Sequence, residues 1–160
     1  MNTKERILIT KGIDKVKQQK LEEAIELFDR VLEINPKNTE AWNNRGVALF
    51  QLGKGEEAIK CYDRALQIDP NFLEPLRNKG FVLRTLEKFD SALECYDRLI
   101  ATEADPGDLR YKAFVLVGLG RLEEAVECLI EAAKIEPSNM IKEEIDVLKS
   151  MISRSDNADK

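Results

Sequence analysis

The residue types that perform covalent catalysis are scarce in this chain of 160 residues. Histidine does not occur, which excludes Ser-His-Asp and Cys-His catalysis as well as zinc sites of the HExxH type. Carboxylate pairs such as Glu22-Glu23 are adjacent in sequence, and adjacent side chains on a helix point in different directions. The sequence also lacks a phosphate-binding loop and a nucleophile with a matching base. We therefore expect a protein that is not an enzyme and that holds no cofactor.

Cysteine is the remaining residue type that could bind a metal or form a cross-link. Cys61, Cys95 and Cys128 are odd in number and form no CxxC motif, so we expect neither a disulfide framework nor a metal site. Free cysteine usually behaves as a small buried hydrophobe, and we expect that role here. Unpaired thiols fit a reducing cytoplasm.

The charge of the chain limits the classes of partner. The formal net charge is -5, so the basic footprint that nucleic acid or an anionic lipid surface requires is missing. The apolar stretch Ile7-Leu8-Ile9 is too short for a signal peptide or a membrane span. We expect neither nucleic acid nor a membrane as a partner.

The same residue types recur about every 34 residues along most of the chain. Alanine occupies the same place in four successive segments, at Ala24, Ala58, Ala92 and Ala125. Glycine follows the same spacing at Gly12, Gly46 and Gly80, and Ala113 takes the fourth place. Such a period is the signature of a repeat architecture. We predict four units over residues 5–38, 39–72, 73–105 and 106–139.

Each unit is predicted to form two helices. The second helix of the first unit carries one apolar stripe at helical spacing, formed by Leu21, Ala24, Ile25, Phe28, Val31 and Leu32. Gly46 and Gly80, in first helices, are expected to face Ala58 and Ala92 in second helices, so that the two backbones approach closely.

A further helix is predicted to close the array. Ile141, Ile145, Leu148 and Ile152 follow helical spacing, so we expect a capping helix over residues 140–153. Repeat arrays need such a helix to cover the last apolar face. The polar residues 154–160 are expected to form a disordered tail.

The units resemble the tetratricopeptide repeat (TPR), whose pattern is W-x2-L-G-x2-Y…A-x3-F…P over 34 residues. The second unit matches best, at Trp42, Gly46, Ala58, Tyr62, Ala65 and Pro70. The resemblance implies an all-α, right-handed solenoid of four helix-turn-helix repeats with a C-terminal capping helix. It also implies a non-catalytic scaffold for protein-protein interaction, which binds an extended peptide or a partner helix in its concave groove.

One feature departs from the family pattern. The leucine place before the glycine is basic in every unit, at Lys11, Arg45, Lys79 and Lys112. Because acidic residues recur in the same units and long cationic stems can cover apolar surface, we expect a solvated or salt-bridged column rather than a nucleic-acid site.

The resemblance assigns groove-facing places to the first helix of each unit. The candidate groove residues at these places are Asn44, Val47, Arg77, Asn78, Phe81, Arg110, Tyr111 and Phe114. Asn can bond to an extended peptide backbone, Arg can hold a carboxylate through two hydrogen bonds, and Phe can anchor an apolar side chain. The expected partner is a protein or peptide in which an apolar residue lies next to an acidic group. For Phe81 and Phe114, packing between adjacent repeats is an equally good interpretation.

Some proteins of the family hold the C-terminal carboxylates of heat-shock chaperones through a clamp of Lys, Asn and Arg. Only one asparagine of that clamp is matched here, Asn44 or Asn78 according to the frame, and Glu74 would repel a carboxylate. The sequence therefore argues against a standard chaperone clamp.

Structural self-assembly is the alternative function. Ile7, Ile9 and Ile13 form an apolar row on the first predicted helix, where no earlier repeat covers it. A homo-oligomer without a peptide ligand would bury this row.

Overall fold

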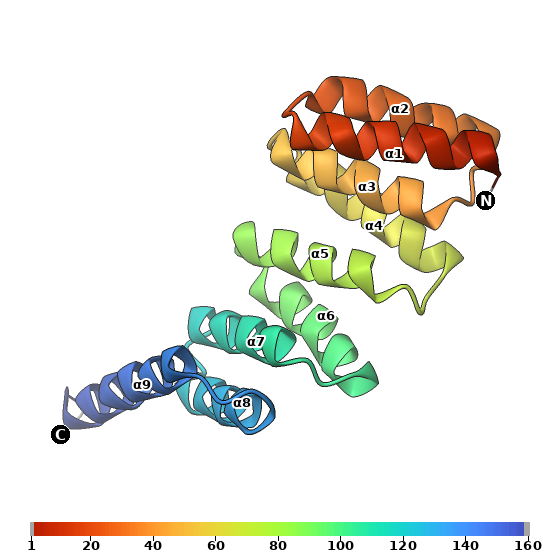
Figure 1. Cartoon of the computed structure of the whole chain (residues 1–160). Helices are drawn as coiled ribbons and strands as arrows, with labels where there is room; N and C mark the ends of the chain where they lie inside the picture. The colour runs from red at the N-terminus through yellow and green to blue at the C-terminus, as the bar shows by residue number, and fades with distance from the viewer. Residues whose placement is uncertain (1, 159–160) are drawn as a thin grey trace. The chain divides into compact units, whose positions relative to one another are not determined.

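The computed structural model describes residues 2–158, and the regular structure in that range is entirely α-helical (Figure 1). The helices are α1 (Thr3–Lys17), α2 (Leu21–Ile34), α3 (Thr39–Gln51), α4 (Gly55–Ile68), α5 (Leu73–Thr85), α6 (Phe89–Thr102), α7 (Pro106–Gly118), α8 (Leu122–Ile135) and α9 (Asn139–Ala158). The chain divides between Leu86 and Glu87 into an N-terminal unit that holds α1–α5 and a C-terminal unit that holds α6–α9. This division falls inside the predicted third repeat, 73–105.

In the N-terminal unit, α1 packs on α2, α3 packs on α4, and α2 and α4 each pack on the first helix of the next pair (Figure 1). Phe28, Val31 and Tyr62 are among its fully buried side chains, as the amphipathic stripes predict. The helix starts are capped locally. Asn2 and Glu5 form a capping box at α1, and the side chain of Asn38 accepts the Ala41 N–H at α3.

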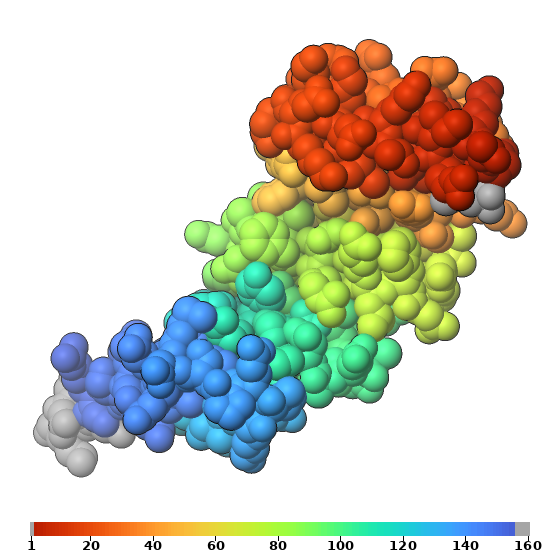
Figure 2. Space-filling view, in the orientation of Figure 1, coloured from red at the N-terminus to blue at the C-terminus, as the bar shows by residue number. Residues whose placement is uncertain are grey.

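In the C-terminal unit, α7 packs on α6 and α8, and α9 packs on α8. One buried cluster joins the last three helices, and it includes Leu116, Leu129, Ile141 and Leu148. The space-filling view shows that α9, in blue, lies at the surface of this unit (Figure 2). One side of α9 therefore belongs to the core and another is open.

The helix α9 is longer than the sequence predicts. It begins at Asn139 and continues to Ala158, whereas a capping helix over 140–153 and a disordered tail over 154–160 were expected. Residues 154–158 are therefore helical, and residues 159–160 lie outside the described part of the chain. The apolar stripe ends at Ile152, but a polar segment without Gly or Pro can continue a helix that is already nucleated.

Gly12 and Gly46, in first helices, lie against an aromatic ring of the second helix. A Cβ atom added to Gly46 would lie 2.6 Å from Cε1 of Tyr62, and one added to Gly12 would lie 2.5 Å from Cε1 of Phe28. The contact of Gly46 with Ala58 stays a prediction, and the contact with the Tyr62 ring is an addition to it. The missing side chain makes room for an aromatic ring of the second helix.

The basic column is salt-bridged at three of its four places. Arg45 pairs with Asp29 at 2.7 Å, Lys79 with Asp63 at 2.5 Å, and Lys112 with Asp97 at 2.6 Å. Each bridge joins the first helix of one repeat to the second helix of the repeat before it. Exposed pairs of this kind contribute at most about 1 kcal/mol each, so their main effect is to favour one register between neighbours.

Candidate functional site: a groove between α7 and α9

The candidate groove asparagines of the N-terminal unit form hydrogen bonds within the protein. The Asn43 side chain is fully buried, donates to Oε1 of Glu74 at 3.0 Å and accepts from Nδ2 of Asn78 at 3.0 Å. Nδ2 of Asn44 donates to the carbonyl of Glu40, one turn back on α3, at 2.8 Å. We expected both amides to be open to a peptide backbone. Each is half-buried and uses one of its two N–H donors within the protein.

The apolar candidates of this unit lie at the surface of its core. Val47 is half-buried and packs on the cluster that contains Tyr62. Phe81 is 37% exposed, and its ring meets Phe50 edge to face at 5.7 Å. The guanidinium of Arg84 lies 5.1 Å from the centre of the Phe81 ring, a cation–π distance. Phe81 therefore has packing contacts and exposed surface at the same time. Arg77 is half-buried on the same helix.

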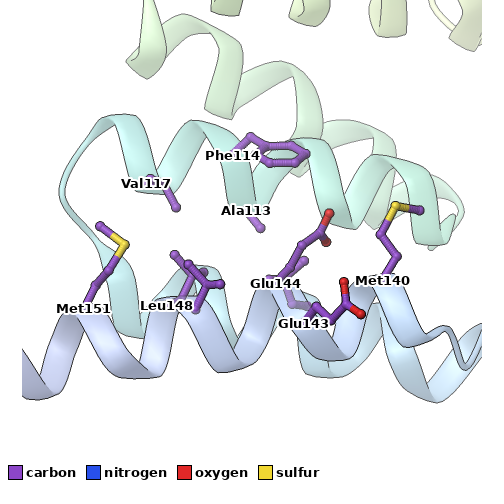
Figure 3. A pocket seen from close by; sticks show the side chains of 10 residues that line it. Ala113, Phe114, Val117, Met140, Glu143, Glu144, Leu148 and Met151 are labelled. Atoms are coloured by element: carbon purple, nitrogen blue, oxygen red, sulfur yellow. The ribbon is translucent and has the colours of Figure 1, made fainter.

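The C-terminal unit contains a pocket of about 400 Å³ between α7 and α9 (Figure 3). In Figure 3, Ala113 and Val117 point from α7 toward α9, and Met140, Glu144 and Met151 point back toward α7. The lining residues are Ala113, Phe114, Val117, Leu129, Met140, Glu143, Glu144, Val147, Leu148 and Met151. We call this pocket the α7/α9 groove. Of the predicted groove residues, Phe114 lines it.

In the fourth repeat, a different pair of residues occupies the places of the glycine and the aromatic ring. In the first two repeats a glycine lies under an aromatic ring, as Gly46 does under Tyr62. The same two places of the fourth repeat hold Ala113 and Leu129, and both line the groove. A leucine is shorter than a tyrosine, so a methyl group fits at the first place.

Arg110, the candidate ligand for a partner's acidic group, is already bound to a carboxylate. Its Nε and Nη2 atoms donate to Glu144 on α9 at 3.2 and 2.5 Å. These hydrogen bonds raise the pKa of Arg110 above its ordinary value. The bidentate geometry is the one we predicted, but the carboxylate comes from the capping helix and not from a ligand. Tyr111 is stacked on Tyr96, with ring centres 5.9 Å apart.

Models of one known protein family match several segments of this chain. Models of the tetratricopeptide repeat match residues 39–72 and 112–139, and a further TPR repeat model matches residues 14–53. The chain is a tetratricopeptide repeat protein. No curated protein matches its sequence.

Solved structures with the same fold share little sequence with this TPR protein. MamA residues 41 to end from Desulfovibrio magneticus RS-1 is 20% identical with a TM-score of 0.86, covering 99% of this chain and 90% of the other. A further MamA crystal structure is 19% identical, with a TM-score of 0.85 and coverages of 99% and 87%. A tetratricopeptide repeat protein from Parabacteroides merdae ATCC 43184 is 21% identical, with a TM-score of 0.80 and coverages of 96% and 61%. These likenesses confirm an all-α TPR solenoid.

Sequence reasoning missed the residues that α9 contributes to the groove of this TPR protein. Met140, Val147 and Met151 follow helical spacing and are 54%, 57% and 43% exposed. The row lies one residue out of phase with the buried stripe of α9, which begins at Ile141. Two adjacent apolar rows on one helix were the signal that could have revealed it, because a cap needs only one.

The cysteines of the TPR repeats are buried and form no disulfide, as predicted. Burial raises the pKa of the Cys61 thiol, which also accepts a hydrogen bond from Arg45 at 3.1 Å. Within the described residues, no group of three or more His, Cys, Asp or Glu side chains could hold a metal ion. None of the described helices combines the length and the apolar character of a membrane span.

Proposed function

We propose that the chain is a non-catalytic interaction scaffold of the cytoplasm, which binds a peptide or a partner helix in the α7/α9 groove. The supporting observation is the exposed apolar surface of the groove. Phe114, Met140, Val147 and Met151 are each at least 43% exposed, and they gather at one pocket. A contiguous exposed apolar patch marks a site of interaction. Three free cysteines favour a reducing compartment.

The shape of the groove favours a peptide chain over a small molecule. The row from Met140 to Met151 extends about 16 Å along α9 at 1.5 Å per residue, which is three helical turns. The two methionines suit a peptide, since their flexible side chains adapt to irregular apolar surfaces.

The acidic group that we expected on the partner has no support at Arg110. That guanidinium is engaged by Glu144, which neutralises its charge and uses two of its five N–H donors. Phe114 keeps the role that the sequence predicts, an apolar anchor in the groove.

Capture of partners from the native lysate tests the proposal. We expect Val147→Glu to lose a partner that the wild-type protein retains, because a carboxylate would then lie in the apolar groove. Ile135→Glu is the matched control, since Ile135 is 49% exposed and lies outside the groove lining. Retention of every partner by the Val147→Glu variant would contradict the proposal.

Self-assembly remains the second candidate, with support from one side chain. Of the predicted apolar row, Ile9 is 2% exposed and Ile13 packs on the core, whereas Ile7 is 49% exposed beside Arg6 and Lys11. Sedimentation velocity over a range of concentrations decides the matter. Self-assembly predicts oligomers that Ile7→Glu dissociates, and a monomer at all concentrations contradicts it.

A further inference from the structure

The charges around the α7/α9 groove are predominantly negative. Glu143 is exposed and lines the groove. Glu144 also lines it and neutralises Arg110. Among the lining residues, the charge that remains is therefore the Glu143 carboxylate. Arg154 follows Val147 by seven residues, so it lies on the same side of α9 beyond Met151, outside the groove lining.

The lysines of α9 lie away from the groove. Lys142 lines a different depression, together with Ala133 and Pro137. Lys149 is seven residues from Lys142, which places the two on the same side of the helix. That side is opposite Val147, at 3.6 residues per turn. Neither lysine lines the groove.

The net charge of the whole C-terminal unit is also negative. Residues 87–160 contain 10 Lys and Arg against 17 Asp and Glu, a formal charge of -7. Residues 1–86 contain 15 basic against 13 acidic residues, a formal charge of +2. The unit that carries the groove thus attracts cations and repels an acidic peptide.

From this charge pattern we infer that the occupant of the α7/α9 groove is a basic amphipathic helix of a partner protein. Its apolar side chains lie on Phe114, Val147 and the two methionines, and its Lys or Arg side chains meet Glu143. The inference rests on the proposed function and specifies the chemistry of the partner. A groove between two helices that is three turns long accepts the apolar face of a third helix.

A second copy of this chain fits the groove less well. Its basic helix α1 offers one exposed large apolar side chain, Ile7, against four in the groove. The surfaces are therefore unequal in apolar area, and a separate partner is the better match.

Two synthetic peptides test the inference. Both are amidated helices of about 18 residues, long enough to be helical, with leucine at positions i, i+3, i+4 and i+7 and with either lysine or glutamate elsewhere. The chain contains 3 methionines, of which Met140 and Met151 both line the groove. Their ¹³C-labelled methyl groups report binding directly by NMR. We expect the Leu/Lys peptide to shift both resonances and the Leu/Glu peptide to bind at least about tenfold more weakly.

A charge reversal localises the effect. Glu143→Lys should weaken binding of the Leu/Lys peptide by about threefold to tenfold, because an attraction at a partly exposed site becomes a repulsion. Glu127→Lys is the matched control, with the same change of charge at an exposed residue of α8 outside the groove lining, and it should change the affinity less than about twofold. Circular dichroism verifies that both variants are folded.

Each other outcome overturns a stated claim. If neither peptide shifts the methionine resonances, the groove is not a binding surface and the proposed function fails together with the inference. If the Leu/Glu peptide binds as tightly as the Leu/Lys peptide, the basic partner is wrong and the proposed function stands. Equal losses in the two charge-reversal variants would assign the attraction to the whole unit rather than to the groove. A dimer that Ile7→Glu dissociates would make a second copy the occupant.

Discussion

The ring of Tyr62 lies where the side chain of residue 46 would be in any residue but glycine. Tyr62 is 1% exposed, and burial raises its pKa far above the ordinary value. A buried ring cannot move away from a new methyl group, because a close-packed interior has no free volume to receive it. At this scale, packing therefore couples two residues on different helices.

Gly46→Ala should lower the free energy of unfolding by about 1–2 kcal/mol. Overpacking costs about 1–3 kcal/mol, and the better helix propensity of alanine returns up to about 1 kcal/mol. Adding Tyr62→Leu copies the pair Ala113 and Leu129 of the fourth repeat. The double variant should therefore be more stable than the sum of the two single effects predicts. Urea denaturation of all four proteins measures this coupling, and strict additivity would contradict it.

The capping helix and the first helix are each fixed by polar contacts to a distant segment. Glu144 joins α9 to Arg110 on α7. Glu5 joins α1 to the turn after α2, where its Oε2 accepts from Asn35 at 3.1 Å and from Asn38 at 2.9 Å. Glu5 is 4% exposed, so its carboxylate depends on these hydrogen bonds.

Acid should weaken the attachment of α1. The amides of Asn35 and Asn38 lower the pKa of Glu5 below its ordinary value. A lowered pKa in the folded state stabilises the fold above the unfolded pKa of about 4.3, and this stabilisation is lost as the pH falls through the folded pKa. Glu5→Gln should therefore be less stable than wild type near neutral pH, and the two stability curves should converge as the pH falls to about 3. Thermal melts across this range measure the difference, and a constant offset would contradict the assignment.

The sequence predicts elements better than it predicts their polar neighbours. The spacing of Ala24, Ala58 and Ala92 is enough to identify the repeats, since every unit must bury the same face. The family resemblance, and not the spacing, assigns Phe114 to a groove, and Phe114 lines the pocket between α7 and α9. The partner of Arg110 is 34 residues away in Glu144, and no local pattern reveals such a pair. The hydrogen bond from Asn78 to Asn43, 35 residues away, is hidden for the same reason.

At the scale of the whole molecule, stability in a repeat array is the sum of units and of the interfaces between neighbours. In the C-terminal unit, α9 covers Leu129 with Ile141 and Leu148. The cap therefore acts first on α8.

Deletion of residues 139–160 should speed amide hydrogen exchange in α8 most, in α7 next, and leave α1 and α2 unchanged. The exposed apolar face of α8 would no longer be covered, so its local opening would cost less. Glu144→Gln serves as a milder comparison, since it loosens α9 without removing it. Unchanged protection in α8 after the deletion would contradict the role of α9 as a cap.

The column of salt bridges between successive repeats does not continue after the fourth repeat. Each bridge needs an acid on the second helix of one repeat and a base on the first helix of the next, as Asp97 and Lys112 supply. The next acidic place along the chain holds Ile130, and the next basic place holds Asp146 on α9. After the fourth repeat, the chain thus has an isoleucine at the acidic place and an aspartate at the basic place. These two side chains end the column. A repeat copied in place of α9 would bring its own base, so a further bridge of this kind needs an acidic residue at the place of Ile130.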